Sequence, residues 1–298
     1  MILAADIGNT HIELGCIGDD GTITGPVQMS TDRVETAYEY AAEIRQILHL
    51  IGIKRTELEG SIISSVVPGV TVVMRRAFKI LTGKEPYVLG QNIASGLKVD
   101  MDGITADQIA GDLVATAVAA GEEYILPSII IDIGTATTIT VVNRDKVYVG
   151  GCIMPGPGTA LKGMLSDTSL LPAIDFSAPK RVIAKDTVDA MKSGILFGSA
   201  GALDGIIDRY AAELRGETPA MNHCSGNGGT KNSALRPGSS SSDSTKNDSC
   251  DRTPTIIATG GMGRIIAPYC SHTIVVDDNL LLKGLWIIWQ RNHGQAQE

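Results

Sequence analysis

Residues 128–142 read SIIIDIGTATTITVV, and this stretch decides the fold that the sequence predicts. Two β-branched runs flank a turn that carries a carboxylate at Asp132, a glycine at Gly134 and a cluster of threonine hydroxyls. β-Branched residues favour strands and glycine favours a tight turn, so the pattern predicts a β-hairpin. Glycine lets backbone amides approach an anion closely, and hydroxyls donate hydrogen bonds to it. The tip of this hairpin is therefore expected to hold phosphate.

The same pattern occurs near the start of the chain, where residues 4–15 read AADIGNTHIELG. The carboxylates, Asp6 and Asp132, would repel phosphate, so each is expected to hold a cation or to order water. Two facing hairpins of this kind could close on a nucleoside triphosphate from both sides. Two ordinary hairpins with tight glycine turns are the alternative. The matched pair favours phosphate binding.

Composition limits the classes of function. A chain of 298 residues with 43% hydrophobic and 19% charged residues is typical of a soluble globular protein with one large or two modest domains. The net charge of -8 argues against nucleic acid or an anionic membrane as a partner, because both attract a positive field. The 5 cysteines include no C-x-x-C pair and are expected to be reduced thiols. The few residues before Asp6 are too short for a signal peptide, so the expected location is the cytoplasm.

The order of predicted elements suggests an internal duplication. In the first half, strands are expected over 2–6, 12–17, 22–29, 60–67 and 86–89, with helices over 34–51, 68–81 and 109–120. In the second half, strands are expected near 128–133, 137–143, 146–153, 255–258 and 274–276, with helices near 158–166, 187–214 and 280–291. Four glycines between 194 and 205 are expected to weaken the long helix near Gly201.

The fold class predicted from this order is α/β, with two ribonuclease-H-like domains around a central cleft. Each domain is a mixed sheet with packed helices, and the predicted boundaries are 1–122 and 123–298. Residues 216–253 contain almost no apolar side chain, so they are expected to form a disordered surface insertion. A functional lid is the alternative for this segment.

Several further motifs make the chain resemble a known family. Besides the two hairpins, they are GGCIMPG at 150–156, AMKSG at 190–194, TGG at 259–261 and DNLLLKGL at 278–285. This ordered set resembles the type III pantothenate kinases, of the superfamily of sugar kinases, Hsp70 and actin, and it covers nearly the whole chain except the insertion. The resemblance implies an actin-like ATPase fold. It also implies phosphorylation of the primary hydroxyl of pantothenate by ATP, the first committed step toward coenzyme A, by a homodimer.

The resemblance also implies roles for individual residues. The ATP phosphates would contact the first hairpin, at Asp6, Ile7, Gly8, Asn9, Thr10, His11, Ile12 and Glu13, and the second at Thr135. Asp132 would hold a monovalent cation, potassium or ammonium, and Mg²⁺ would accompany the nucleotide. The substrate would contact Thr105, Ala106, Asp107 and Gln108, and also Thr187 across a dimer interface. Asp107 would be the base that accepts the hydroxyl proton.

Residue chemistry alone offers another interpretation of Asp107. Thr105 and Gln108 have the spacing of a helix capping box, and an acidic residue in the first turn of a helix is favoured by the helix dipole. The residues alone favour this structural interpretation of Asp107, whereas the resemblance favours its role as the base.

The chain departs from the family pattern at the substrate end. Family members usually carry G-A-D-R where residues 105–108 read TADQ, so a substrate-facing arginine becomes the neutral Gln108. The usual Tyr-Asp-Asn-Pro run is replaced by residues 101–104, and an asparagine before Thr187 by Asp186. Two alternatives to a pantothenate kinase therefore stay open: a noncatalytic nucleotide-binding paralogue, or a kinase of another small hydroxylated acceptor.

Overall fold

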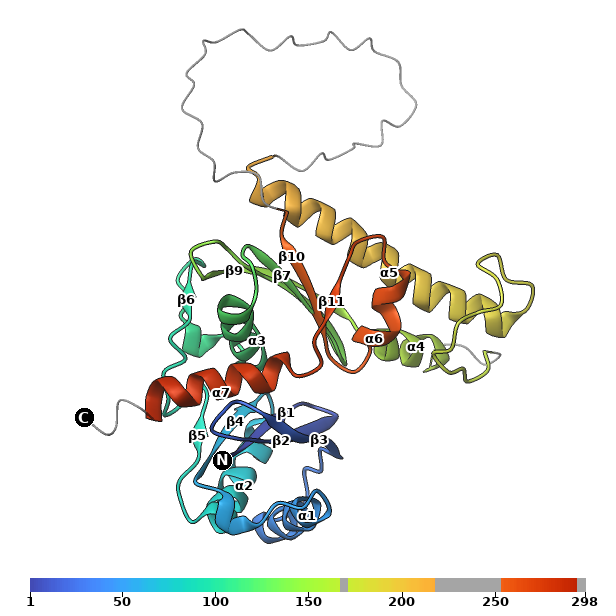
Figure 1. Cartoon of the computed structure of the whole chain (residues 1–298). Helices are drawn as coiled ribbons and strands as arrows, with labels where there is room; N and C mark the ends of the chain where they lie inside the picture. The colour runs from blue at the N-terminus through green and yellow to red at the C-terminus, as the bar shows by residue number, and fades with distance from the viewer. Residues whose placement is uncertain (167–170, 218–252, 294–298) are drawn as a thin grey trace, which may run out of the picture.

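The computed structural model describes residues 1–166, 171–217 and 253–293. Nearly all of the segment expected to be a disordered insertion, residues 216–253, lies outside the described residues. The described chain folds into a mixed α/β structure with two sheets (Figure 1). Its helices include none that is long and apolar enough to cross a membrane.

The first sheet has the strand order β3-β2-β1-β4-β5. β1 (Ile2–Ile7), β2 (His11–Ile17) and β3 (Ile23–Ser30) form an antiparallel meander, and β4 (Gly60–Ser65) and β5 (Tyr87–Val88) run parallel to β1. Two helices follow the meander, α1 (Ala37–Leu50) and α2 (Pro68–Thr82). Thr36 begins α1 with a capping box to Glu39, and Gly83 ends α2 in the left-handed conformation.

The second sheet repeats this order. β7 (Ser128–Ile133), β8 (Ala136–Val142) and β9 (Val147–Pro155) form the meander, and β10 (Thr255–Thr259) and β11 (Val275–Val276) run parallel to β7. One short strand, β6 (Lys98–Val99), adds to the outer edge beside β9. The repeated order 3-2-1-4-5 agrees with the duplicated ribonuclease-H-like core expected from the sequence.

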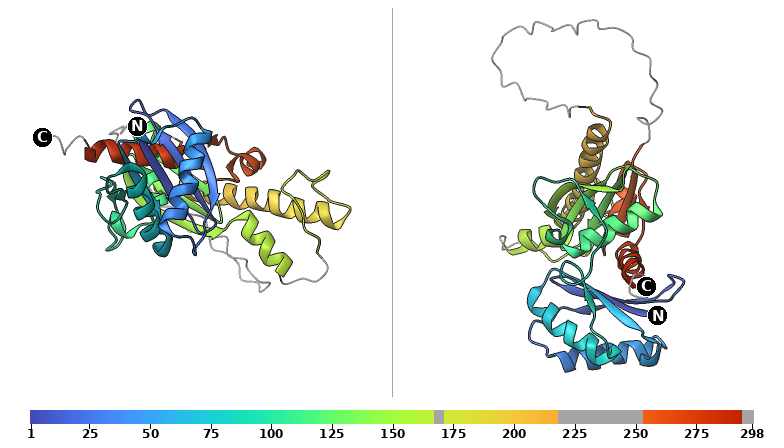
Figure 2. Two further views of the ribbon diagram at one scale, coloured as in Figure 1. Left: turned by 90° about the horizontal axis from the view of Figure 1, so that it is seen from below. Right: turned by 90° about the vertical axis from the view of Figure 1, so that its left-hand side faces the viewer.

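The helices form three layers around the two sheets. α3 (Gly111–Glu123) and α7 (Leu280–His293) pack together between the sheets, as the perpendicular view also shows (Figure 2). α1 and α2 cover the outer face of the first sheet, and α5 (Thr187–Leu214) and α6 (Gly263–Ile266) cover the outer face of the second. The alternation within β1 explains this order, because Leu3, Ala5 and Ile7 face α1 and α2 while Ile2 and Ala4 face α3 and α7.

Close backbone contact holds the middle layer. A Cβ built on Gly284 of α7 would lie 1.9 Å from the carbonyl oxygen of Ala115 in α3, so only glycine fits there. α7 comes from the end of the chain yet packs on the first sheet, while β6 comes from the first half yet joins the second. The boundary expected at residue 122 stays a prediction.

α5 is continuous, which differs from the expected weakening near Gly201. Leu196, Ala200, Leu203 and Ile207 bury one side of it against the second sheet, and this burial offsets the low helix propensity of glycine. Its first turns extend beyond the sheet beside α4 (Pro157–Ser166), as Figure 1 shows. The remaining short helices are η1 (Arg55–Glu57), η2 (Ala106–Gln108) and η3 (Ala267–Tyr269). Cys16, Cys152 and Cys270 are free thiols, as expected for these three.

Candidate active site

The turns of the two hairpins meet. In each turn the glycine amide closes the loop: Gly8 N–H donates to the His11 carbonyl and Gly134 N–H to the Ala136 carbonyl, both at 3.0 Å. The hydroxyl oxygens of Thr10 and Thr135 lie 3.1 Å apart and share a hydrogen bond. Two stretches that lie far apart in the sequence therefore form the two sides of one site.

A group of carboxylates lies behind these turns. Asp6 is near the end of β1, opposite Glu13 of β2 and Ser64 of β4. Asp132 occupies the matching position in β7, opposite Thr259 of β10. Asp112 lies in the first turn of α3, in the layer between the sheets.

Besides burial, the negative charges of neighbouring carboxylates contribute to the raised pKa values of Asp6 and Asp132. Burial, the nearby charge of Asp112, and the charges of Asp132 and Glu13 raise the pKa of Asp6 well above its usual range. Burial, followed by the charges of Asp112 and Glu13, raises the pKa of Asp132 to about 7. Burial also raises the pKa of Asp112. Three carboxyl groups from three elements thus share one low-dielectric region, where like charges disfavour full ionisation.

The surroundings of Asp6 and Asp132 suit a cation shared with phosphate. Asp6 Oδ1 is buried, and within the described residues no hydrogen-bond donor reaches it. No set of three or more His, Cys, Asp or Glu side chains in the described part of the chain is arranged to chelate a metal ion. Mg²⁺ commonly binds through one or two carboxylates together with phosphate oxygens and water. The residues present fit a cation held in that way.

Glycine brings the backbone close to the second carboxylate. Gly260, in the turn after β10, has a φ of +81°, and a Cβ there would lie 2.3 Å from Asp132 Oδ1. Gly156 has a similar role beside the turn, because its Cβ would lie 2.0 Å from the Gly134 carbonyl oxygen. Gly156 N–H and the Thr159 hydroxyl both donate to the Thr135 carbonyl, at 3.1 and 2.6 Å. These contacts fix the second turn in place.

Other contacts fix the first turn. Thr31 N–H donates to the Thr10 carbonyl at 3.1 Å, and the Thr31 hydroxyl donates to the Gly8 carbonyl at 2.7 Å. Arg33 donates to the Asn9 side chain at 3.1 Å. Farther along β2, Glu13 lies inside the site, and its pKa is raised by burial and by Asp278 in the turn before α7.

The residues expected to contact ATP are therefore brought together with Asp132. Asp107 is not. It lies on η2, where its side chain is exposed and where hydrogen bonding to Thr105 lowers its pKa. Gln108 Oε1 accepts a hydrogen bond from Thr105 N–H at 3.0 Å, so the capping-box interpretation describes this segment. Asp107 therefore lies outside the group of buried hairpin carboxylates, and its role as the base stays a prediction.

Asp112, only five positions later, was missed by the sequence analysis, although a signal was present. Ala110 and Gly111 precede it, and small residues indicate close approach of backbones. A Cβ on Gly111 would lie 2.8 Å from the Ser64 hydroxyl oxygen, which shows how tightly the start of α3 packs against β4.

Two of the expected substrate residues line a cavity that extends to Gly111 at the start of α3. Ala106 and Asp107 line a cavity of about 290 Å³ together with Leu89, Ile93 and Ile109. Thr187 is the first residue of α5, exposed on the part of that helix that extends beyond the second sheet. Within one copy of the chain, Thr187 is not brought to the hairpin carboxylates.

Comparison with known sequences identifies the relatives of this chain. The sequence profile described as type III pantothenate kinase matches residues 2–209. A type III pantothenate kinase of Citrifermentans bemidjiense is 34% identical over 98% of this chain and 100% of its own length. One from Bacillus cytotoxicus is 32% identical over 98% of this chain and 97% of its own length.

The chain belongs to the type III pantothenate kinase family.

Membership in the type III pantothenate kinase family bears on the placement of the G-A-D-R pattern. Ala110-Gly111-Asp112-Leu113 shares with this pattern two small residues, in the reverse order, followed by a carboxylate that is buried, whereas the carboxylate of residues 105–108 is exposed.

Solved structures agree on the fold. A Baf family protein from Campylobacter jejuni, titled as a transcriptional activator, aligns over 98% of this chain and 100% of its own with a TM-score of 0.55 and 16% identity. Component A of the Acidaminococcus fermentans (R)-2-hydroxyglutaryl-CoA dehydratase aligns over 100% and 99% with a TM-score of 0.51 and 11% identity. At these identities the likeness concerns the fold alone.

Proposed function

We propose that this protein is an ATP-dependent kinase that phosphorylates pantothenate, the first step toward coenzyme A. The observation that carries the proposal is the meeting of Asp6, Asp132 and Asp112 behind two hairpin turns whose threonines touch. Phosphoryl transfer needs positioned phosphates, cations to offset their charge and one well-placed carboxylate. The acceptor, pantothenate, is inferred from the names of the relatives.

The two hairpin turns hold the nucleotide phosphates. Residues 6–13 and Thr135 offer backbone amides and hydroxyls on both sides of the site, and glycines at 8 and 134 permit close approach. In this protein the contact between Thr10 and Thr135 gives way to contacts with the phosphate chain. Bound cations supply the charge that offsets repulsion between the phosphates and the carboxylates.

Asp6 and Asp132 hold those cations. Asp6 supplies an unpartnered oxygen for Mg²⁺. Asp132, buried in the matching position of the second hairpin, supplies a carboxylate oxygen for potassium or ammonium. Both pKa values are raised, so a bound cation also stabilises the ionised form of each carboxylate. We expect phosphate oxygens and water to supply the remaining ligands of both cations.

Asp112 acts as the general base. It lies beside the two cation-binding carboxylates, and burial raises its pKa toward the neutral range in which a carboxylate accepts protons better. Asp107 has the opposite properties, because it is exposed and its pKa is lowered. The base role expected for Asp107 is therefore assigned to Asp112 in this proposal.

A second copy of the chain completes the substrate pocket. Thr187 begins the projecting part of α5, and the segment leading to it exposes Val182 and Ile183, at 64% and 79%. A second chain that covers these two side chains would bury their apolar surface. In a homodimer the projection of one subunit would bring Thr187 toward the site of the other.

A coupled assay of ADP release tests the proposal. The expected result is ADP release with Mg·ATP that requires pantothenate and is faster in potassium or ammonium than in sodium. Nucleotide binding without release on pantothenate would contradict it and favour a noncatalytic paralogue. Release with a different hydroxylated acceptor only would contradict the assigned substrate.

A further inference from the structure

A basic pocket lies on the first lobe, where the segment after α2 folds back against that helix. The pocket encloses about 350 Å³ between α2 and residues 85–91. Arg75, Arg76 and Lys79 line it, and Glu85 is the one carboxylate among its lining residues. Three cations against one anion is an unusual concentration of positive charge in a chain whose net charge is -8.

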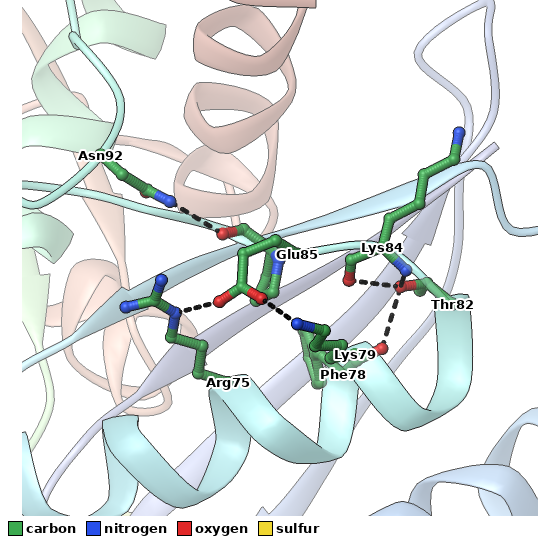
Figure 3. Close-up of polar contacts among 8 residues, drawn as sticks. Arg75, Phe78, Lys79, Thr82, Lys84, Glu85 and Asn92 are labelled. Atoms are coloured by element: carbon green, nitrogen blue, oxygen red, sulfur yellow. Dashed lines mark hydrogen bonds and ion pairs between the residues drawn. The ribbon is translucent and has the colours of Figure 1, made fainter.

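Glu85 orders two of the three cations. Lys79 Nζ lies 3.0 Å from Glu85 Oε2, and Arg75 Nε donates to Glu85 Oε1 (Figure 3). Lys79 and Arg75 lower the pKa of Glu85, which keeps this carboxylate ionised. Because Glu85 uses only Nε of Arg75, the two terminal nitrogens of the guanidinium point away from it in Figure 3. Lys84 extends away from this group and takes no part in it.

Arg76 has no assigned partner. Within the described residues it makes no hydrogen bond or ion pair, and its side chain is exposed. On a helix, residues three apart are neighbours, so Arg76 and Lys79 lie on adjacent parts of the surface. The guanidinium groups of Arg75 and Arg76 present planar sets of N–H donors, a geometry that matches phosphate oxygens.

We propose that this pocket binds the phosphate monoester of a small organic molecule. A pocket of about 350 Å³ falls within the range of small-molecule sites, about 300–1,000 Å³, and exceeds what phosphate alone would fill. The phosphate binds the free edge of Arg75 and the guanidinium of Arg76, while Glu85 keeps its contacts to Arg75 Nε and Lys79. Val72, which is 56% exposed at the pocket, and the Gln91 amide face the organic part.

This pocket is separate from the kinase site. It contains none of the residues of the two hairpin turns and none of the three carboxylates behind them. The inference therefore does not rest on the proposed function.

Isothermal titration calorimetry with glycerol 3-phosphate tests the site, with ionic strength held constant and glycerol as the comparison ligand. Wild type is expected to bind glycerol 3-phosphate saturably with one site per chain and not to bind glycerol. Arg76→Gln and Arg75→Gln are each expected to weaken binding about 10-fold or more, since a hydrogen bond to a charged group contributes about 1.5–3 kcal/mol. All variants are expected to keep wild-type kinase turnover, which verifies folding.

Arg45→Gln is the matched control, because Arg45 is an exposed arginine on α1 outside the pocket. It is expected to bind the ligand as wild type does. Equal weakening by Arg45→Gln would mean that net charge alone governs binding and would overturn the proposal. The proposal would also be overturned if wild type showed no saturable binding or if Arg76→Gln bound the ligand unchanged. Loss of binding in Asp132→Asn would overturn it as well, because that result would place the ligand in the kinase site.

Discussion

The hairpins β1–β2 and β7–β8 have the same strand structure but different surroundings. Their strands have the same lengths and the same burial pattern at every position. Their supports differ: Thr31 and Arg33 fix the first turn, whereas Gly156, Thr159 and the close approach of Gly260 fix the second. The strand pattern therefore fixes where each carboxylate lies, and the loops from elsewhere in the chain decide what surrounds it.

The largest expected effect concerns Asp112, which raises the pKa of both hairpin carboxylates. Asp112→Asn removes the proposed base and is expected to lower kcat by about 10²–10⁴-fold, the usual contribution of a general base. Steady-state ADP release measures it. Asp107→Asn is the matched control and should stay within a few-fold of wild type. Loss of activity in Asp107→Asn alone would return the base role to η2.

The second hairpin depends on a glycine that the first does not use. Gly260→Ala places a Cβ against Asp132 Oδ1 at a positive φ, so we expect roughly 1–3 kcal/mol of destabilisation and at least a tenfold loss in kcat/KM. Gly52→Ala is the control, because Gly52 has a φ of +79° and open space around its Cβ position. It should cost some stability and leave the kinetics unchanged. Equal kinetic loss in both variants would show that backbone strain, and not contact with Asp132, is responsible.

The raised pKa of Asp132 predicts how stability changes with pH. Between the usual carboxyl value, about 4, and about 7, the folded state keeps a proton that the unfolded state has lost. The free energy of unfolding should therefore fall as pH rises through this window, with a loss of a few degrees in Tm, since about 1 kcal/mol shifts Tm by about 2–4 °C. Thermal unfolding at pH 5 and pH 8 measures the change.

Two additions sharpen this pH test. Mg·ATP with potassium should restore more stability at pH 8 than at pH 5, because the cations bind the ionised carboxylates. Asp132→Asn should reduce the difference in Tm between the two pH values. A Tm that rises between pH 5 and pH 8 without cations would contradict the arrangement of buried carboxylates.

The smallest effect tests the contact between the turns. Thr10→Ala, Thr135→Ala and the double variant form a cycle in which the hydroxyl pair should contribute about 0.5–1 kcal/mol of coupling. Chemical denaturation of the nucleotide-free protein measures it. Full additivity would mean that the turns do not touch in solution.

The sequence predicted the features that depend on neighbouring residues, and it did not predict those that depend on packing between distant segments. The two hairpins were predictable, because strand alternation and turn glycines are local signals, and β7 has the predicted bounds. The continuity of α5 was not, because burial against the second sheet overrides the glycines of that helix. The choice between Asp107 and Asp112 had only a weak local signal, the small residues Ala110 and Gly111 before Asp112. Asp107 precedes the apolar helix α3 and Asp112 lies in its first turn, and the packing of Gly111 against Ser64 places the second carboxylate inside the site.

The central claim is that Asp6 and Asp132 act together on one bound nucleotide. Calorimetric titration of wild type, Asp6→Asn, Asp132→Asn and the double variant with magnesium and a nonhydrolysable ATP analogue, in potassium buffer, tests this claim directly. The account predicts strong non-additivity, with the double variant losing little more affinity than the worse single variant, because each carboxylate works only with the other in place. Losses that add fully, as they do for carboxylates in separate sites, would contradict it.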